Sequence, residues 1–494
     1  MKKLIITLFN CFILTFLVSS CESWIDVEPD DRLTEDMVFS SQKGFLQALN
    51  GIYAEMNDAS VYGGNLSVGI IDVLAQYYDG GPDNTYSYYY YSRYDYTATA
   101  VKNTFAAIWA KMYSLISSAN IIIEKCNQTS VLSESYRKQI KGEALALRAM
   151  LHFDLLRLFG PVASQPSSLD TQPSSLDPQP SVAIPYVTVA DQTIQDILPA
   201  DEVMKHILAD LTEASQLLED ADPLLAQESL PQLGDDAGGS QYRLNYFAVQ
   251  VLLARAYLWN GDKAAALDIA TATIDRAQTL FPFTTTAAAS GAYPDRMFSS
   301  EVLFSLYNTS RINVYRKYFA ATLDPRRILS FAGTLDAGRV PELYDSQNDL
   351  RYRMWAASAE GDNDLIFNKY EDVTLNDGST EGYCYMMPLI RLSELYLIAA
   401  ECESDEEQAL SYLNTLRNHR GCPDLHPTTP EELLAAITSE FRKETIGEGQ
   451  MFYFYKRHAM QNIPNGSAMT GDMNMQLKNY VVPIPDSETD NRLE

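Results

Sequence analysis

The sequence predicts a mainly α-helical protein that contains tetratricopeptide-type helix pairs and an irregular, loop-rich subregion with short strands. Three observations support this fold class. Long segments carry apolar residues at helical spacing, and one pair of segments has the residue spacing of a tetratricopeptide repeat. A stretch in the second half of the chain shows neither the helical nor the repeat spacing.

Helical segments dominate the first half of the chain. The segment 135–159 is apolar on nearly every side, which indicates a buried helix, and Gly160-Pro161 ends it. Helices are predicted at Gln42–Met56, Phe105–Lys125, Ser135–Phe159 and Asp201–Leu218. A Pro/Ser-rich direct repeat at 163–180 is a low-complexity loop, to which we assign no function.

The next two helices, Asn245–Asn260 and Lys263–Ala277, carry the repeat pattern. Ala254, Tyr257, Gly261 and Ala266 have tetratricopeptide spacing, because small residues let two antiparallel helices approach and the glycine occupies the tight turn. Thr273 stands where another alanine is usual, so the match is partial. The scaffold therefore covers residues 41–280 and includes an aromatic loop at 77–96.

The second half begins with an irregular subregion at 281–387, which is rich in Tyr, Arg, Asp and Gly and contains strand-like runs such as Val302–Leu306. It is too long to be a loop without secondary structure in a compact domain. We expect this subregion to lie on the side of the scaffold that binds the ligand. Residues 388–494 then return to helices, at Leu389–Glu403, Glu406–Arg420 and Glu431–Thr445.

The N-terminus has the features of a lipoprotein signal peptide over residues 1–20. Two lysines precede an apolar run, and small residues lead to Cys21, whose thiol is the expected site of lipidation. The alternative is a soluble exported protein in which Cys21 is incidental. Residues 21–40 form an acidic tether and extension. No later stretch is expected to span a bilayer, so the lipid is the expected membrane anchor.

The formal charge excludes some partners. Loss of residues 1–20 removes Lys2 and Lys3 and no acidic residue, which changes the charge from −28 to −30. Nucleic acid is not an expected partner, because phosphate binding needs a cationic surface. A negative field also disfavours polyanionic ligands.

Motifs for catalysis, metals and cofactors are absent from the sequence, so we predict no catalytic residue, no metal and no cofactor. A glycosidase needs only two carboxylates, so a hydrolase stays an open alternative. His152 lies in an apolar helix and is expected to be a satisfied core residue. Cys384 and Cys422 fall at the same end of a predicted helical hairpin, where they could form a disulfide. Free thiols are the favoured prediction.

A tyrosine tract is the strongest local anomaly, with seven tyrosines in residues 86–96. Tyrosine combines a flat apolar face with a hydroxyl, which suits stacking on sugar rings. The tract is expected in a surface loop or strand. The alternative to ligand binding is that its tyrosines alternate between core packing and solvent, as in a β-ribbon. The candidate ligand residues are Tyr86, Tyr88, Tyr89, Tyr91, Arg93, Tyr94 and Tyr96. A weaker cluster adds Tyr307, Arg311 and Tyr315, for which internal ion pairing is the alternative.

Several segments together resemble the SusD/RagB family of nutrient-binding outer-membrane lipoproteins. They are Gly142–Ala149 continuing to Gly160, Ile390–Glu401, Glu440–Glu444 with Gly447–Gln450, and Val482–Pro485. Arg492 departs from the family pattern, which has proline there. Motif residues of this kind are expected in buried ion pairs between helices: Arg148, Arg391, Glu394 and Glu440.

The resemblance implies both an architecture and a role. About four tetratricopeptide-type helix pairs would form a right-handed superhelical scaffold that supports a variable ligand face. The protein would be lipid-anchored in the cell outer membrane and face outward. It would capture an oligosaccharide or polysaccharide, or a peptide in the RagB-like branch, and pass it to a SusC-like TonB-dependent transporter.

Overall fold

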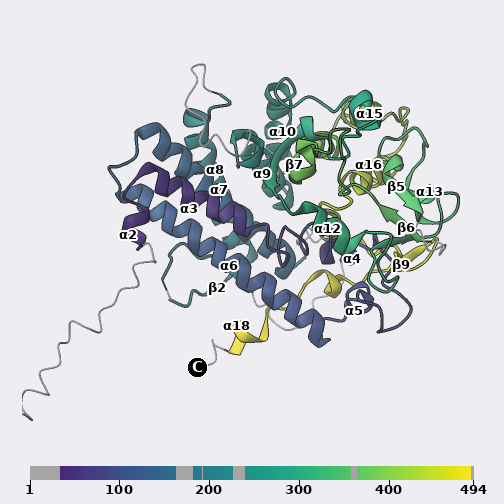
Figure 1. Cartoon of the computed structure of the whole chain (residues 1–494), viewed down its shortest axis with the longest axis horizontal. Coiled ribbons are helices and arrows are strands. Elements are labelled where there is room, and N and C mark those ends of the chain that lie inside the picture. Colours follow the sequence, from purple (N-terminus) through teal and green to yellow (C-terminus); the bar gives the residue numbers. More distant parts are fainter. Residues whose placement is uncertain (1–33, 163–181, 192, 226–239, 358–363, 491–494) are drawn as a thin grey trace, which may run out of the picture.

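The computed structural model of this chain describes residues 34–162, 182–191, 193–225, 240–357 and 364–490. The predicted signal peptide, Cys21 and the low-complexity loop lie outside these ranges. The described residues form a mainly helical protein with few short strands, which confirms the predicted fold class (Figure 1).

Four helix pairs form the scaffold. They are α3 (Gln42–Glu55) with α6 (Thr99–Gln128), α7 (Glu134–Phe159) with α8 (Ala200–Ala221), α9 (Tyr246–Trp259) with α10 (Lys263–Ala277), and α14 (Leu392–Cys402) with α15 (Glu406–His419). Successive pairs also touch, through α6 and α7, α8 and α9, and α10 and α14. The tetratricopeptide-like arrangement predicted from the family resemblance is therefore confirmed.

The α9–α10 pair has the features that its sequence predicts. Ala254 and Ala266 are fully buried between the helices. Gly261 adopts φ +85° in the turn, a conformation that residues with a Cβ rarely take. Thr273, in place of the usual alanine, is buried, and its Oγ1 donates to the carbonyl of Ile269 at 2.6 Å. The hydroxyl is satisfied within its own helix, so the helices still pack.

Helix α6 differs from the expectation that no later segment could cross a membrane. Its length and mean hydropathy of 1.3 would allow it to span a bilayer. Half of that apolar window is buried, however, and α6 packs against both α3 and α7. The core packing of α6 thus accounts for its apolar character.

The irregular subregion contains two small antiparallel sheets. Strand β3 (Val302–Tyr307) pairs with β7 (Met386–Arg391), and β6 (Asp364–Phe367) lies between β4 (Ser330–Ala332) and β5 (Trp355–Ala357). The predicted helix at Leu389–Glu403 was wrong at its start, because Met386–Arg391 pairs with β3 and the helix begins only at Leu392.

Further elements complete the chain around these parts. The helices are α2 (Glu35–Val38), α4 (Ile70–Leu74), α5 (Tyr89–Ser92), α11 (Thr286–Ser290), α12 (Arg311–Tyr318), α13 (Arg339–Leu343), α16 (Pro430–Glu444), α17 (Met451–Arg457) and α18 (Asp486–Asp490). The strands are β1 (Val182–Pro185), β2 (Ile197–Pro199), β8 (Asn462–Pro464) and β9 (Asp472–Asn474). Short 3-10 turns cover Ser240–Tyr242, Ser299–Glu301, Tyr352–Met354, Gly382–Tyr385 and Leu477–Tyr480.

A buried ion network joins the irregular subregion to the C-terminal helices. Its cations are Arg351, Lys369, Arg391, Arg417, Arg420 and Lys443, and its carboxylates are Glu301, Asp345, Asp349, Glu440, Glu444 and Glu448. Every member except Asp345 is buried. Equal numbers of opposite charges keep the network neutral, which removes the large cost of an unpaired charge in the interior.

All four residues predicted in ion pairs form them, although Arg391 ends strand β7 and does not lie in a helix, and Glu394 is only partly buried. Arg391 and Glu440 belong to the network. Arg148 donates from Nε and Nη2 to Asp210, at 2.7 Å each. Glu394 accepts two hydrogen bonds from Arg255, at 2.6 and 2.7 Å.

Candidate ligand-binding surface

The tyrosine tract folds as a compact loop between α4 and α6, not as a ribbon, with a single helical turn at α5. Tyr88, Tyr91 and Tyr94 point into the protein and are at least nine-tenths buried. Tyr91 shares a hydrogen bond of 2.7 Å with Thr104, and Tyr94 donates to the carbonyl of Leu74 at 2.9 Å. Their burial argues against the prediction that these three bind ligand, because their rings and hydroxyls pack in the core.

The outer side of the loop exposes a different set of side chains. Tyr86 and Tyr89 are partly exposed, and Arg93 is exposed. The Arg93 guanidinium carbon lies 3.8 Å from the ring centroid of Tyr89, a stacked cation–π arrangement. Arg93 Nη1 also donates to the Tyr89 carbonyl at 3.2 Å, and Nη2 to the Gly81 carbonyl at 3.0 Å. Arg93 thus closes the loop and supports its exposed ring.

Glycine shapes the other edge of this surface. Gly81 has φ +79°, and a Cβ there would lie 2.1 Å from Cγ of Tyr86, so only glycine lets the Tyr86 ring lie against the backbone. Tyr90, which the sequence reasoning left out of the candidate site, contacts Tyr89 edge-to-face at a centroid distance of 5.3 Å. We call Tyr86, Tyr89, Tyr90 and Arg93 the tyrosine surface.

Two contacts hold the loop against distant segments. Tyr96 is half-buried and donates to the carbonyl of Asn479 at 2.6 Å. The backbone N–H of Ser87 donates to the carbonyl of Arg326 at 2.9 Å. The tyrosine surface is therefore preorganised by the C-terminal segment and by the irregular subregion.

The second predicted cluster, Tyr307, Arg311 and Tyr315, also contains both exposed and buried side chains. Tyr307 is 40% exposed and forms an aromatic group with Tyr242 and Tyr385, at centroid distances of 5.1 and 5.5 Å. Tyr315 is half-buried and donates to Asn368 at 3.2 Å. Arg311 is buried and lies 3.4 Å from Asp372, so the structure favours internal ion pairing over ligand binding for this residue.

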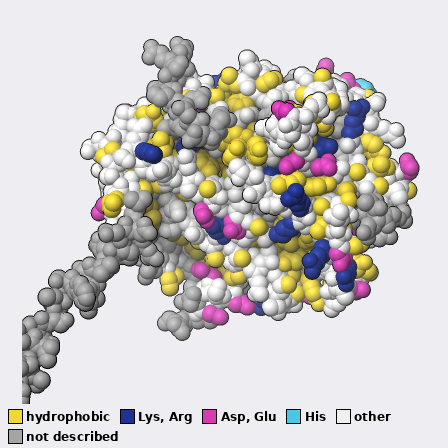
Figure 2. Space-filling view, in the orientation of Figure 1, with side chains coloured by type: hydrophobic (Ala, Val, Ile, Leu, Met, Phe, Trp, Pro, Cys, Tyr) yellow, Lys and Arg dark blue, Asp and Glu magenta, His cyan; other side chains and the backbone are white. Residues whose placement is uncertain are grey.

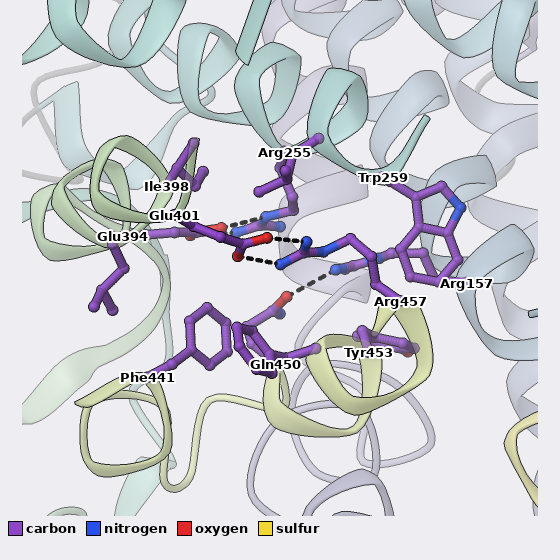
Figure 3. Close-up of a pocket in the computed structure, with 13 residues that line it drawn as sticks. Arg157, Arg255, Trp259, Glu394, Ile398, Glu401, Phe441, Gln450, Tyr453 and Arg457 are labelled. Carbon is purple, nitrogen blue, oxygen red and sulfur yellow. Dashed lines mark hydrogen bonds and ion pairs between the residues drawn. The ribbon is translucent and has the colours of Figure 1, made fainter. Parts of the chain in front are cut away.

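A half-open cavity of about 40 Å³ lies where α7, α9, α14, α16 and α17 meet (Figure 3). Arg255 pairs with Glu394 and Arg457 with Glu401, while Arg157 donates to Gln450 at 3.0 Å. Ligand sites typically enclose roughly 300–1,000 Å³. This cavity is too small for a sugar, and its charges are satisfied by the scaffold.

A shallow groove of about 510 Å³ runs between α2, α3 and α6. Its lining mixes apolar side chains such as Phe39, Ile52 and Leu115 with small residues such as Gly51, and an ion pair of Lys111 and Glu55 belongs to it. The groove is built from other helices than the tyrosine surface. It has few polar groups that converge on one point, which a selective sugar site needs.

The histidine and the two cysteines that the sequence analysis singled out have structural environments. The His152 ring is buried, interacts through Nδ1 with the Arg148 carbonyl at 2.9 Å and accepts at Nε2 from the Val187 N–H at 3.0 Å, as expected of a satisfied core residue. Cys384 and Cys422 are free, as favoured from the sequence. In the described ranges, no three His, Cys, Asp or Glu side chains gather as a metal site.

A helical-repeat scaffold with an aromatic surface and internally paired charges defines a class of binding proteins. Comparison with known proteins gives the family. Residues 23–232 match a SusD-like family described as "Starch-binding associating with outer membrane", and residues 357–492 match the SusD family. This chain belongs to the SusD/RagB family, as its motifs predicted.

Individual relatives agree over nearly the full length. The SusD-like protein P2 of Formosa agariphila is 23% identical, over 99% of this chain and 97% of its own. A SusD superfamily crystal structure from Bacteroides thetaiotaomicron superposes with a TM-score of 0.69 at 23% identity, over 91% of this chain and 98% of its own. A SusD-like carbohydrate binding protein from Bacteroides vulgatus gives 0.66 at 18% identity, over 91% and 96%. At these identities the structural likeness establishes the fold.

Proposed function

We propose that this protein is a cell-surface lipoprotein that captures oligosaccharide or polysaccharide and passes it to a SusC-like TonB-dependent outer-membrane transporter. Membership of the SusD/RagB family supports a role in nutrient uptake at the outer membrane, and the matched family description names starch binding. The tyrosine surface is the observation that carries the proposal for this chain.

The chemistry of the surface suits a sugar. A pyranose ring offers a face of C–H groups that stacks on an aromatic ring, while its hydroxyls need hydrogen-bond partners. Tyr86 and Tyr89 supply rings and phenol hydroxyls, and both are already held in place by Gly81 and Arg93. Because the loop is ordered before a ligand arrives, little conformational entropy is lost on binding.

Binding of the purified ectodomain to a polysaccharide panel tests this proposal. Tyr86→Ala and Tyr89→Ala should each weaken binding of the captured glycan by about tenfold, which corresponds to about 1.4 kcal/mol. Tyr136→Ala removes a partly exposed tyrosine at the start of α7 and should leave affinity unchanged. Equal losses in all three variants, or none in the first two, would reject the tyrosine surface as the site.

The same panel separates the alternatives. A peptide-binding role would need cations that hold peptide carboxylates. Arg316 is exposed and could do so, whereas Arg311 is buried. Binding to peptides but to no glycan would nevertheless establish that role. Release of reducing ends by the purified protein would indicate a hydrolase.

The transporter partner needs its own test. Affinity purification of the tagged, membrane-anchored protein from its native outer membrane should recover a TonB-dependent barrel. Recovery of the lipoprotein without any barrel, under conditions that keep other outer-membrane complexes intact, would reject the hand-over step while leaving glycan capture in place.

A further inference from the structure

Basic side chains gather around the tyrosine surface, although the chain as a whole carries a formal charge of −28. Figure 2 shows dark blue side chains concentrated over the region where Figure 1 places α12 and α5. The exposed cations of this region are Arg93, Arg316, Lys317, Arg326 and Arg327. We call these five residues the basic cluster.

Contacts between the segments make the cluster and the tyrosine surface one continuous region. The Ser87 N–H bonds the Arg326 carbonyl at 2.9 Å, which joins the tyrosine loop to the segment 324–327. The Lys317 ammonium lies 4.7 Å from the ring centroid of Tyr318. The Tyr318 carbonyl in turn accepts a hydrogen bond from the Leu329 N–H at 2.8 Å, which joins the end of α12 to the same 324–329 stretch. The end of α12 therefore lies beside the tyrosine loop.

The nearby carboxylates neutralise the cluster only in part. Asp324 pairs with Arg326 at 2.5 Å. Asp58 and Asp83 accept hydrogen bonds from Ser60 and Thr85 in local turns. Within the described ranges, no carboxylate lies at ion-pair distance from Arg93, Arg316, Lys317 or Arg327.

Local charge decides what such a surface attracts. At physiological ionic strength, exposed charges are screened over about 8 Å, so most of the protein's acidic residues act weakly at the tyrosine surface. Net charge alone predicted a protein that disfavours polyanions. The arrangement of the cations reverses that prediction at this one place, because unpaired arginine forks bind carboxylates and sulfates in two-pronged geometry.

We propose that the glycan captured at the tyrosine surface is anionic and bears carboxylate or sulfate groups that the basic cluster recognises. This inference rests on the proposed glycan-binding function and names its ligand class. The aromatic rings would stack on the sugar, and Arg316, Lys317 and Arg327 would contact the acidic substituents of the same chain.

Matched ligands test this proposal on the intact ectodomain. Dextran sulfate is compared with dextran, and polygalacturonate with its methyl ester, so that each pair differs in charge and keeps its backbone. At least one anionic member should bind tenfold or more tightly than its neutral partner, and its affinity should fall between 50 and 300 mM NaCl because salt screens exposed charges. Which pair responds distinguishes sulfate from carboxylate recognition.

Charge-removal variants locate the effect. The double variant Arg316→Ala with Lys317→Ala should bind the anionic probe at least fivefold more weakly than the wild type. The single variant Arg327→Ala should show a loss of affinity of the same size. The control double variant Lys43→Ala with Lys205→Ala removes the same charge from exposed positions on α3 and α8 and should leave the affinity for the anionic probe unchanged. Preference for the neutral member of both pairs, or equal losses in the test and control doubles, would overturn the proposal. Glycan binding that survives either result would leave the proposed function standing, whereas binding to no glycan at all would reject both.

Discussion

Arg391 and Glu444 bind each other twice inside the core. Arg391 Nη1 lies 2.7 Å from the Glu444 carboxylate, and Nη2 donates to the Glu444 backbone carbonyl at 2.5 Å. The first residue ends strand β7 of the irregular subregion, and the second ends helix α16. Arg351 and Arg420 contact the same carboxylate, and these arginines hold the pKa of Glu444 well below its usual range despite burial.

Replacement of Glu444 by glutamine should therefore destabilise the protein strongly. Three buried guanidinium groups would lose their shared counter-charge, and breaking a buried pair costs about 3–5 kcal/mol. Chemical denaturation measures the loss of unfolding free energy. Glu431→Gln, at an exposed position of the same helix, should change it by less than about 0.5 kcal/mol. A small effect of Glu444→Gln would contradict the view that the network supports the fold.

His152 should make stability depend on pH. Burial lowers the pKa of His152 to about 3, whereas an unfolded histidine titrates near 6.5. Between these values the unfolded chain binds the extra proton, so the contribution of the neutral ring to stability is full above pH 6.5 and is lost as the pH falls toward 3. For one proton the slope is about 1.4 kcal/mol per pH unit.

The measurement is unfolding free energy from pH 4 to 7 for the wild type and His152→Gln. The variant should have a flatter profile in this window. His426→Gln alters an exposed histidine and should keep the wild-type slope. Parallel profiles for all three proteins would mean that His152 does not carry the effect.

If Arg93 acts by closing the loop, then the geometry of its guanidinium group is needed for glycan binding and a positive charge alone is not sufficient. Arg93→Lys keeps a cation but cannot span the carbonyls of Tyr89 and Gly81 with a planar fork. We expect severalfold weaker glycan binding with little change in the thermal midpoint, because the side chain is exposed. Isothermal titration and a thermal melt check this. Arg276→Lys is the control, because it changes an exposed arginine that also stacks on a tyrosine ring, Tyr246, but lies on α10, away from the tyrosine surface.

The proposed lipidation of Cys21 predicts an effect on the protein's location and none on ligand recognition. Cys21→Ala should leave glycan affinity of the soluble body intact and abolish uptake by cells, because an unanchored protein would diffuse away from its transporter. Growth on the captured glycan and the fraction of protein in the membrane report the two effects. Normal growth of this mutant would disprove the connection between the anchor and function.

Much of the helical scaffold could be predicted from local sequence. Gly261 and its flanking alanines encode a tight antiparallel pair within a short stretch of chain. The start of α14 could not be predicted, because residues 386–391 carry apolar side chains that suit a helix or a strand. Their partner, β3, lies about eighty positions earlier, and only that pairing makes them a strand.

The candidate site was predictable in position but not in detail. The tyrosine tract identified the loop, yet sequence does not say which rings face inward. Tyr94 is buried because the Leu74 carbonyl and Gln76 amide meet its hydroxyl, and both lie about twenty residues away. Arg93 and Arg316 of the basic cluster were candidates from the sequence, but the cluster as a whole was not predicted, because its members come from separate segments and net charge conceals them.

The neutral ion network has a mechanical consequence. Separating the irregular subregion from helices α14–α16 would break many buried ion pairs at once. An opening between these two parts would therefore be costly, and they are expected to move as one rigid body. If the proposed hand-over to a transporter takes place, we expect the whole body to move against the transporter, with these two parts keeping their relative positions.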